Sequence, residues 1–295
     1  MIVILDLLSM VEPTRTLLAK LTNSTDYISV NVGADEIKPY ILKAREADGT
    51  TKLILGDSVC HQMFTRFQDS TTELSIIGSN AAITPAGQYI LAKTYIESHP
   101  DATDIYLFML PGALGQSFDT NYGYQYTVMP FVETETIGYL DKDTIETMKN
   151  VYGRLFMSPA VVRMIDLSGP NRKIYLNLLK KYSDPYKPVK YFDIADNYIG
   201  KIKELCDKNN IQLHLHPCPV FESRKDDNES LRSEYESSNL YKWFPDYFDE
   251  IVYFPDNETD DDVHFSPEYE DKEHLLSVIN ECYGSLPITN LFQAE

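Results

Sequence analysis

The sequence predicts a doubly wound α/β/α sandwich, in which helices cover both faces of a central parallel sheet of about five strands. Three observations favour this class. Short apolar runs lack polar alternation, as expected of strands buried on both faces. Segments with helical capping residues lie between them, and 43% hydrophobic residues in a chain of 295 can supply a sizeable core.

The apolar runs give the order of the predicted strands. They are 51–56 (TKLILG), 73–78 (ELSIIG), 104–110 (DIYLFML), 211–217 (IQLHLHP) and 249–254 (DEIVYF). Between them, Thr84 and Pro85 begin a helix over 84–98, and the segment 196–210 carries an apolar stripe and ends in Asn-Asn. This alternation of strands and helices predicts the doubly wound sandwich.

A last helix and a long insertion complete the predicted organisation. Ser266 caps the last helix, Pro267 takes its first position and Gly284 ends it. The interval 112–198 is several times a usual connection, so we expect a helical insertion or lid there. Its predicted helices cover 141–156, 158–168 and 171–182, and the other predicted parts are an N-terminal segment at 1–50, the α/β domain at 51–284 and a tail at 285–295.

Charge and cysteine content exclude several classes of protein. The net charge of −19 disfavours a nucleic-acid backbone or an anionic membrane as partner. Four scattered cysteines without a CxxC pair disfavour a zinc ribbon and a disulfide scaffold. The apolar start MIVILDLLSM is interrupted by Asp6 and lacks the features of a signal peptide. We expect a soluble chain, or the soluble part of a protein whose anchor lies outside this chain.

A serine follows the first predicted strand directly, in GDSV. Catalytic groups of an open parallel sheet gather at the carboxyl ends of its strands, where Ser58 lies. A hydroxyl becomes a strong nucleophile only beside a base. The simpler interpretation of Ser58 is a helix N-cap.

One of the six histidines is placed to act as that base. His264 lies between the fifth predicted strand and the last helix, and Asp261 precedes it by three residues, a spacing that lets the carboxylate hold Nδ1–H. Asp262 is the alternative partner. We interpret His61 as structural or solvent-facing, and His99 and His274 as ordinary surface residues.

These motifs resemble the SGNH (GDSL-like) hydrolase and acyltransferase superfamily. GDSV after the first strand, a glycine after the second (IIGSN) and DxxH at 261–264 are similar to its first, second and fifth blocks, over about residues 50–284. The resemblance implies that Ser58 is the nucleophile, His264 the general base and Asp261 its orienter. It also implies an oxyanion hole that includes the backbone N–H groups of Ser58 and Gly78.

The chain departs from the family pattern after the third strand. FMLPGALGQSF stands where the family carries Gly-x-Asn, so the side-chain oxyanion donor is Asn80, Gln116 or absent. In this departure the chain resembles the divergent branch of the superfamily, which contains the D-alanyl-teichoic-acid transfer protein and the SGNH domains of polysaccharide O-acetyltransferases. That branch implies an extracytoplasmic, membrane-associated setting, with the cytoplasm as the alternative, and an acyl donor delivered by a membrane acyltransferase partner.

Other features have weaker functional interpretations. His214 and His216 point to one face of a strand, but no third metal ligand accompanies them, so we expect packing roles, or a substrate contact for His216. Tyr122, Tyr124 and Tyr126 lie just past the third strand and would line an acceptor cleft or anchor a lid. No glycine-rich nucleotide motif follows any strand.

Three functions are compatible with these residues. The first is an acyltransferase that moves an acyl group, expected to be acetyl, to a hydroxyl of a surface carbohydrate through an acyl-serine. The second is a carbohydrate esterase or deacetylase with the same triad, and the third is a non-catalytic module that binds a glycan or a protein. None of them requires a metal or a cofactor.

Overall fold

A computed structural model describes residues 33–70, 72–115, 121–127, 129–132, 134–158, 161–162, 165, 174, 177–178 and 191–292. The chain divides into two compact units. One consists of Met1–Pro39 and Ser117–Pro188, and the other of Tyr40–Gln116 and Val189–Glu295. The second unit contains the sheet and the three residues predicted to be catalytic.

The second unit is an α/β fold around a four-stranded parallel sheet with the order β2-β1-β3-β4. Its strands are β1 (Lys52–Gly56), β2 (Leu74–Gly78), β3 (Asp104–Met109) and β4 (Gln212–Pro217). The first four predicted strands are therefore confirmed. β1 lies between β2 and β3, so its carboxyl end is in the middle of the sheet edge.

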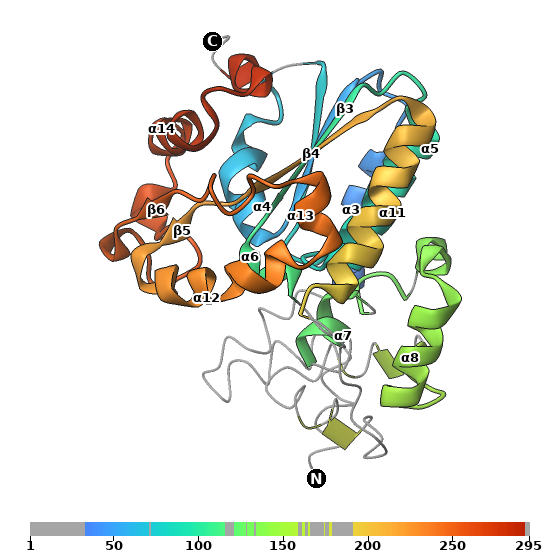
Figure 1. Ribbon diagram of the computed structural model, residues 1–295. Helices are drawn as coiled ribbons and strands as arrows, with labels where there is room; N and C mark the ends of the chain where they lie inside the picture. The colour runs from blue at the N-terminus through green and yellow to red at the C-terminus, as the bar shows by residue number, and fades with distance from the viewer. Residues whose placement is uncertain are drawn as a thin grey trace, which may run out of the picture. The chain divides into compact units, whose positions relative to one another are not determined.

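The chain reverses direction across the sheet at β1. It crosses from β1 to β2 through α4 (Ser58–Phe64), then returns over β1 to β3 through α5 (Pro85–Ser98). Right-handed crossovers in opposite directions place these helices on opposite faces. Figure 1 shows α4 and α14 (Lys272–Tyr283) on one side and α5 and α11 (Asp193–Asn209) on the other. Ligand sites of doubly wound sheets lie at such a switch point, which is where α4 begins.

Both faces of the sheet are buried, which explains why the strands lack alternation. On one face the Phe108 ring lies 4.7 Å from Phe64 of α4 and 4.8 Å from Tyr283 of α14, between ring centroids. On the other face Tyr89 of α5 and Tyr198 of α11 lie 5.6 Å apart. In β1, Leu53, Ile54 and Leu55 are fully buried, with Ile54 on the α4 side.

Two of the predicted helices have the expected caps. Thr84 Oγ1 accepts the Gly87 N–H at 3.2 Å, and Pro85 is the first residue of α5. Asn210 ends α11 in the left-handed conformation, with φ 58°. Asparagine tolerates this conformation at a helix end.

The start of the last helix differs from the prediction. Ser266 and Pro267 begin only a 3-10 turn, η7 (Pro267–Tyr269), and α14 starts later. Its N-cap is Asp271, whose carboxylate accepts the N–H groups of Glu273 and His274 at 3.0 and 2.9 Å. Asp271 lies four residues ahead of Leu275, the first residue of the apolar stripe, and aspartate is an equally good cap, so here it is the one used.

The fifth predicted strand does not join the sheet. Within 249–254 only Tyr253–Phe254 is extended (β6), and it pairs in parallel with β5 (Val220–Phe221) in a separate two-stranded sheet. Among the described residues the main sheet thus has four strands rather than about five.

Two prolines explain why β4 takes no neighbour at its carboxyl end. The Gln212 N–H donates to Thr103, just before β3, and the Cys218 N–H donates to Met109 at its end, so the N–H groups of the odd-numbered residues of β4 face its outer edge. Pro217 and Pro219 occupy that outer set and have no N–H to donate. A partner strand can pair only beyond them, at β5.

The described part of the first unit contains α7 (Asn121–Thr127), η3 (Glu135–Tyr139) and α8 (Lys142–Tyr152). Asp141 caps α8 by accepting the Thr144 N–H at 2.7 Å, as the helix predicted at 141–156 requires. The predicted helices at 158–168 and 171–182 lie mostly outside the described residues.

The remaining elements are four helices and four 3-10 turns of the described chain. They are α3 (Gly33–Arg45), α6 (Pro111–Leu114), α12 (Lys225–Glu236) and α13 (Asn239–Trp243), with the 3-10 turns η2 (Thr65–Phe67), η5 (Glu222–Arg224), η6 (Asp256–Glu258) and η8 (Pro287–Phe292). The predicted tail is packed rather than free, since the Phe292 ring lies 5.8 Å from Phe64. No helix in the ranges described is both long and apolar enough to cross a bilayer.

Gly56, the last residue of β1, leaves no room for a side chain. A Cβ there would overlap the Phe108 carbonyl oxygen and the Cys60 side chain. We expect Gly56→Ala to lower the free energy of unfolding by about 1 to 3 kcal/mol, measured by urea denaturation. Gly112→Ala is the control, because a Cβ at Gly112 meets nothing within 4 Å. Equal losses in both variants would contradict this packing constraint.

Candidate active site

Ser58, His264 and Asp261 form a connected triad in the second unit. Ser58 Oγ lies 2.8 Å from His264 Nε2, and His264 Nδ1 lies 2.8 Å from Asp261 Oδ2. The two loops are 206 residues apart in the chain. With the carboxylate accepting Nδ1–H, Nε2 is left to accept the serine proton, which is the arrangement of a serine nucleophile with its base.

Ser58 is the first residue of α4 and does not cap it. The N-cap is Asp57, whose Oδ1 accepts the N–H groups of Val59 and Cys60 at 3.0 and 3.3 Å. The interpretation of Ser58 as an ordinary N-cap is therefore wrong. Its hydroxyl is free of that task and faces His264.

The loop before His264 folds back on itself to present the imidazole. Asp261 Oδ1 accepts the N–H groups of Val263 and His264 at 2.9 and 2.7 Å, while its Oδ2 holds the ring. Asp262 provides the turn, with φ 61°, a conformation that aspartate tolerates better than most residues. The ring partner is Asp261, and the alternative partner Asp262 has this backbone role instead.

These hydrogen bonds control the ionisation of Asp261. Burial alone would raise the pKa of its carboxyl, but hydrogen bonds from the His264 ring and from the N–H groups of His264 and Val263 outweigh burial and lower the pKa below its usual value. The carboxylate thus stays negative beside the imidazole. It can stabilise an imidazolium that forms during proton transfer.

Asp57 links the segments that surround Ser58. Besides the two N–H groups of α4, its carboxylate accepts the Leu110 N–H after β3 at 2.6 Å and lies 3.5 Å from the Cys218 thiol after β4. It is 1% exposed. Burial raises its pKa, although these hydrogen bonds oppose the shift. This role of Asp57 was not predicted from the sequence, although aspartate directly before a helix is a recognisable cap.

The cysteines near Ser58 are not competing nucleophiles. Cys60 and Cys218 are buried, and burial followed by the charge of Asp57 raises the pKa of both thiols well above the usual value. Burial also raises the pKa of Cys282 to about 12. A thiol in this state is protonated and unreactive at neutral pH.

The groups predicted to form the oxyanion hole have different surroundings in the structure. The Ser58 N–H has no hydrogen-bond partner in the described part of the chain. Gly78 lies against α4, where a Cβ would approach His61 N to 2.8 Å, and its carbonyl accepts from the His61 ring. Asn80 is exposed, and Gln116 lies outside the described residues. The roles of Gly78 and Asn80 remain predictions.

No asparagine stands between the end of β3 at Met109 and Asn121, the first residue of α7. The first groups after this strand are Leu110, whose N–H is held by Asp57, and the short helix α6. At the position of the Gly-x-Asn pattern, this chain therefore has the Leu110 N–H bonded to Asp57 and the short helix α6.

His61 has the expected structural role, while His99 and His274 are less exposed than predicted. His61 Nδ1 lies 2.8 Å from the Gly78 carbonyl oxygen. His99 is 4% exposed, stacks on Tyr95 and lies 3.2 Å from Asp48, so its interpretation as a surface residue is wrong. His274 is partly buried against the rings of Phe265 and Tyr269.

The two strand histidines pack against aromatic rings and acidic partners. His214 stacks on Tyr106 and bonds Asp104 at 3.0 Å. His216 is buried beside Phe108, and its Nδ1 lies 2.7 Å from Glu250. The described residues contain no group of three or more His, Cys, Asp or Glu that could hold a metal ion.

The tyrosines predicted to contact substrate lie in the first unit. Tyr124 is fully buried, its hydroxyl donates to the Phe156 carbonyl oxygen at 2.6 Å, and its ring lies 4.6 Å from Tyr152. This favours the packing interpretation for Tyr124. Tyr126 is half-buried, and the side chain of Tyr122 lies outside the described residues.

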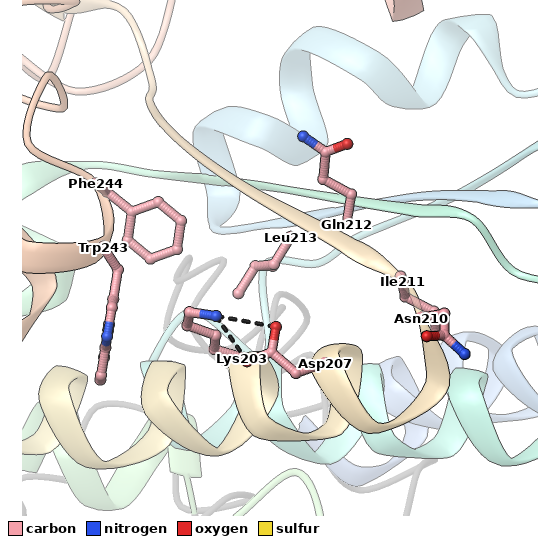
Figure 2. Close-up of a pocket in the computed structure, with 8 residues that line it drawn as sticks. All are labelled: Lys203, Asp207, Asn210, Ile211, Gln212, Leu213, Trp243 and Phe244. Carbon is pink, nitrogen blue, oxygen red and sulfur yellow. Dashed lines mark hydrogen bonds and ion pairs between the residues drawn. The ribbon is translucent and has the colours of Figure 1, made fainter.

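A pocket of about 420 Å³ lies at the other end of β4 (Figure 2). The Trp243 and Phe244 rings border it on one side and Lys203, paired with Asp207 at 2.7 Å, lies across from them. Gln212, the first residue of β4, also lines the pocket. Because the strands are parallel, this is the edge opposite to Ser58, and the pocket is not part of the triad site.

Comparisons with protein-family models, with curated proteins and with solved structures return no match. The functional interpretation of the triad therefore depends on its geometry.

The lowered pKa of Asp261 connects a small part of the stability to pH. Its charged form is favoured by folding, so that contribution is present above the unfolded pKa of about 3.9 and is lost as pH falls through the lower folded pKa. We expect the difference in Tm between wild type and Asp261→Asn to shrink as pH falls from about 6 to about 3. Asp260→Asn is the control on the same loop. A difference that is independent of pH would contradict this linkage.

Removing the Asp57 carboxylate leaves several buried donors without an acceptor. We expect Asp57→Ala to lower the free energy of unfolding by at least about 2 kcal/mol, because a cap and the bond to Leu110 are lost together. Asp271→Ala removes an exposed cap of α14 alone, and should cost about 1 kcal/mol. Chemical denaturation of both variants measures the difference, and equal costs would show that Asp57 is only a cap.

Proposed function

We propose that this protein is an SGNH-type serine enzyme that transfers an acyl group through an acyl-Ser58 intermediate. The observation that carries the proposal is the hydrogen-bonded chain from Ser58 Oγ through His264 to Asp261, with both distances at 2.8 Å. A serine hydroxyl, an imidazole and an ionised carboxylate in this order are the groups that acyl transfer requires.

The first half-reaction forms the acyl-enzyme. Ser58 Oγ attacks the carbonyl carbon of an ester donor while His264 Nε2 accepts its proton, and Asp261 stabilises the resulting imidazolium. The Ser58 N–H is placed to donate to the oxyanion, an interaction usually worth about 3 to 4 kcal/mol. When the intermediate collapses, His264 returns the proton to the departing alcohol and the acyl group stays on Ser58.

The second half-reaction decides between transfer and hydrolysis. A hydroxyl of an acceptor loses its proton to His264 Nε2 and attacks the acyl-Ser58 carbonyl, and His264 then reprotonates Ser58 Oγ. An acceptor alcohol gives a new ester, whereas water gives the free acid. The chemistry of the triad is the same in both cases.

We propose acetyl as the acyl group and a surface carbohydrate as the acceptor. The chain lacks an asparagine directly after β3, and in this it resembles the divergent branch of the superfamily, which acts on sugar or polyol hydroxyls. This resemblance supports the choice of acceptor. The openness of the triad also supports a large acceptor, since the Asp261 and His264 side chains are 55% and 35% exposed. In this proposal the enzyme is extracytoplasmic, and a membrane acyltransferase delivers the donor.

Hydrolysis is the second candidate, as a carbohydrate esterase. The same exposure of His264 lets water reach the acyl-enzyme. The segment after β3 resembles that of the divergent acyltransferase branch, and for this reason transfer is the first proposal.

A fluorophosphonate probe tests for the nucleophile. We expect covalent labelling of wild type that is lost in Ser58→Ala and slowed by at least about a thousandfold in His264→Gln, measured by intact-protein mass spectrometry. Ser277→Ala, on the exposed side of α14, should label like wild type. Folded protein that is not labelled at all would favour the non-catalytic binding module.

Product analysis then separates the two enzymatic candidates. Acyl-enzyme formed from p-nitrophenyl acetate is followed with and without a neutral disaccharide, and the products are identified by NMR. We expect O-acetylated sugar when the acceptor is present. Acetate alone under both conditions would select the esterase.

A further inference from the structure

Gln62 joins the helix of the nucleophile to the loop of the base. Its Oε1 accepts the Phe265 N–H at 2.9 Å, and its Nε2 donates to the Phe265 carbonyl oxygen at 2.7 Å. The side-chain amide thus pairs with one residue through both hydrogen bonds, as a neighbouring strand would. Gln62 is four residues after Ser58 on α4, and Phe265 follows His264 directly.

A carboxylate fixes the orientation of this amide. Gln62 Nε2 also donates to Glu270 Oε1 at 2.6 Å, and an ionised carboxylate can only accept, so it selects the Nε2 end. The other oxygen of Glu270 accepts from Arg66 at 3.0 Å. Arg66 lies one helical turn beyond Gln62, so the network returns to the segment on which it started. Both N–H groups and the carbonyl oxygen of the amide thus have partners.

Phe265 is held from its other side as well. Its ring is 2% exposed and lies 5.2 Å from Phe221 of β5 and 5.6 Å from Phe254 of β6. The ring fixes Phe265 to the small sheet, whereas only Gln62 fixes its backbone to α4 in the described residues. The position of His264 relative to Ser58 therefore depends on the Gln62 amide.

We propose that Gln62 is a positioning residue that sets the distance between Ser58 Oγ and His264 Nε2. The inference rests on the proposed function, since that distance matters only if His264 takes the serine proton. Proton transfer needs heavy atoms within about 2.6 to 3.2 Å, and the present 2.8 Å falls in this range. Gln62 does not touch the reacting atoms and acts through the loop.

The chain supplies a matched control. Gln68 makes the same kind of contact with β2, since its Oε1 accepts the Ile76 N–H at 3.0 Å and its Nε2 lies 3.5 Å from the Leu74 carbonyl oxygen. Both glutamines are half-buried and both pair with backbone. Methionine is close to glutamine in length and shape but lacks the amide. Both variants remove an amide that pairs with backbone, and Gln62→Met also removes the bond to Glu270. Only Gln62→Met is expected to loosen the loop of His264.

The first readout is the rate of fluorophosphonate labelling at saturating and at low probe concentration. We expect Gln62→Met to slow the maximal rate by about tenfold to a hundredfold with little change in half-saturation, and Gln68→Met to label at the wild-type rate. Thermal unfolding of both variants verifies folding. Equal labelling of Gln62→Met and wild type would overturn the proposal.

Replacing the Gln62 amide with a carboxylate tests the orientation of the amide. Gln62→Glu keeps an acceptor for the Phe265 N–H but loses both donors and faces Glu270, so we expect labelling slower than that of wild type. Adding Glu270→Gln removes this repulsion and should restore part of the rate. A double variant that is no faster than Gln62→Glu contradicts the role assigned to Glu270.

The second readout does not depend on activity. NMR signals of the His264 ring nitrogens report its hydrogen bonds to Ser58 and Asp261, and we expect Gln62→Met to change them while Gln68→Met does not. A changed His264 signal in a protein that no probe labels would leave the positioning role intact and remove the proposed function. Unchanged His264 signals with normal labelling of Gln62→Met would remove the positioning role alone.

Discussion

The carboxylate of Asp57 is the constraint on which the site depends. It accepts the Val59 and Cys60 N–H groups of α4 and the N–H after β3, lies 3.5 Å from the thiol after β4, and is 1% exposed. Three chain segments that meet at the switch point of the sheet thus share one acceptor. Because Asp57 caps the helix, the hydroxyl of the next residue, Ser58, is not needed as a cap and can bond His264 instead.

This constraint gives a physical meaning to each residue of Gly-Asp-Ser. Gly56 lets Cys60 and the Phe108 carbonyl approach β1, Asp57 fixes the turn, and Ser58 carries the hydroxyl. Gly78 has a related role on the neighbouring strand, where α4 comes too close for a side chain. Two of the glycines that resemble a family motif are therefore explained by packing, whatever chemistry the serine performs.

The sequence was sufficient for features that depend on local patterns. Runs buried on both faces gave four strands, and the three-residue spacing of Asp261 and His264 gave the local pair, because each is decided within a few residues. Features decided by distant partners were missed. Pro217 and Pro219 could have excluded a fifth strand, but His99 is buried because Asp48, in a different loop, pairs with it. Gln62 has no local signal at all, since its partner is 203 residues away.

The two halves of the triad are held in physically different ways. Ser58 follows a strand whose neighbours are fully buried, so its position is fixed by the core and by Asp57. His264 lies on an irregular loop that is closed by an isolated bridge between Thr259 and Phe265, by the turn at Asp262 and by the Gln62 amide. Loops with exposed hydrogen bonds open at lower free energy than core strands. His264 is therefore the less firmly held of the two side chains, and the geometry of the site is only as stable as the few hydrogen bonds that hold its loop against α4.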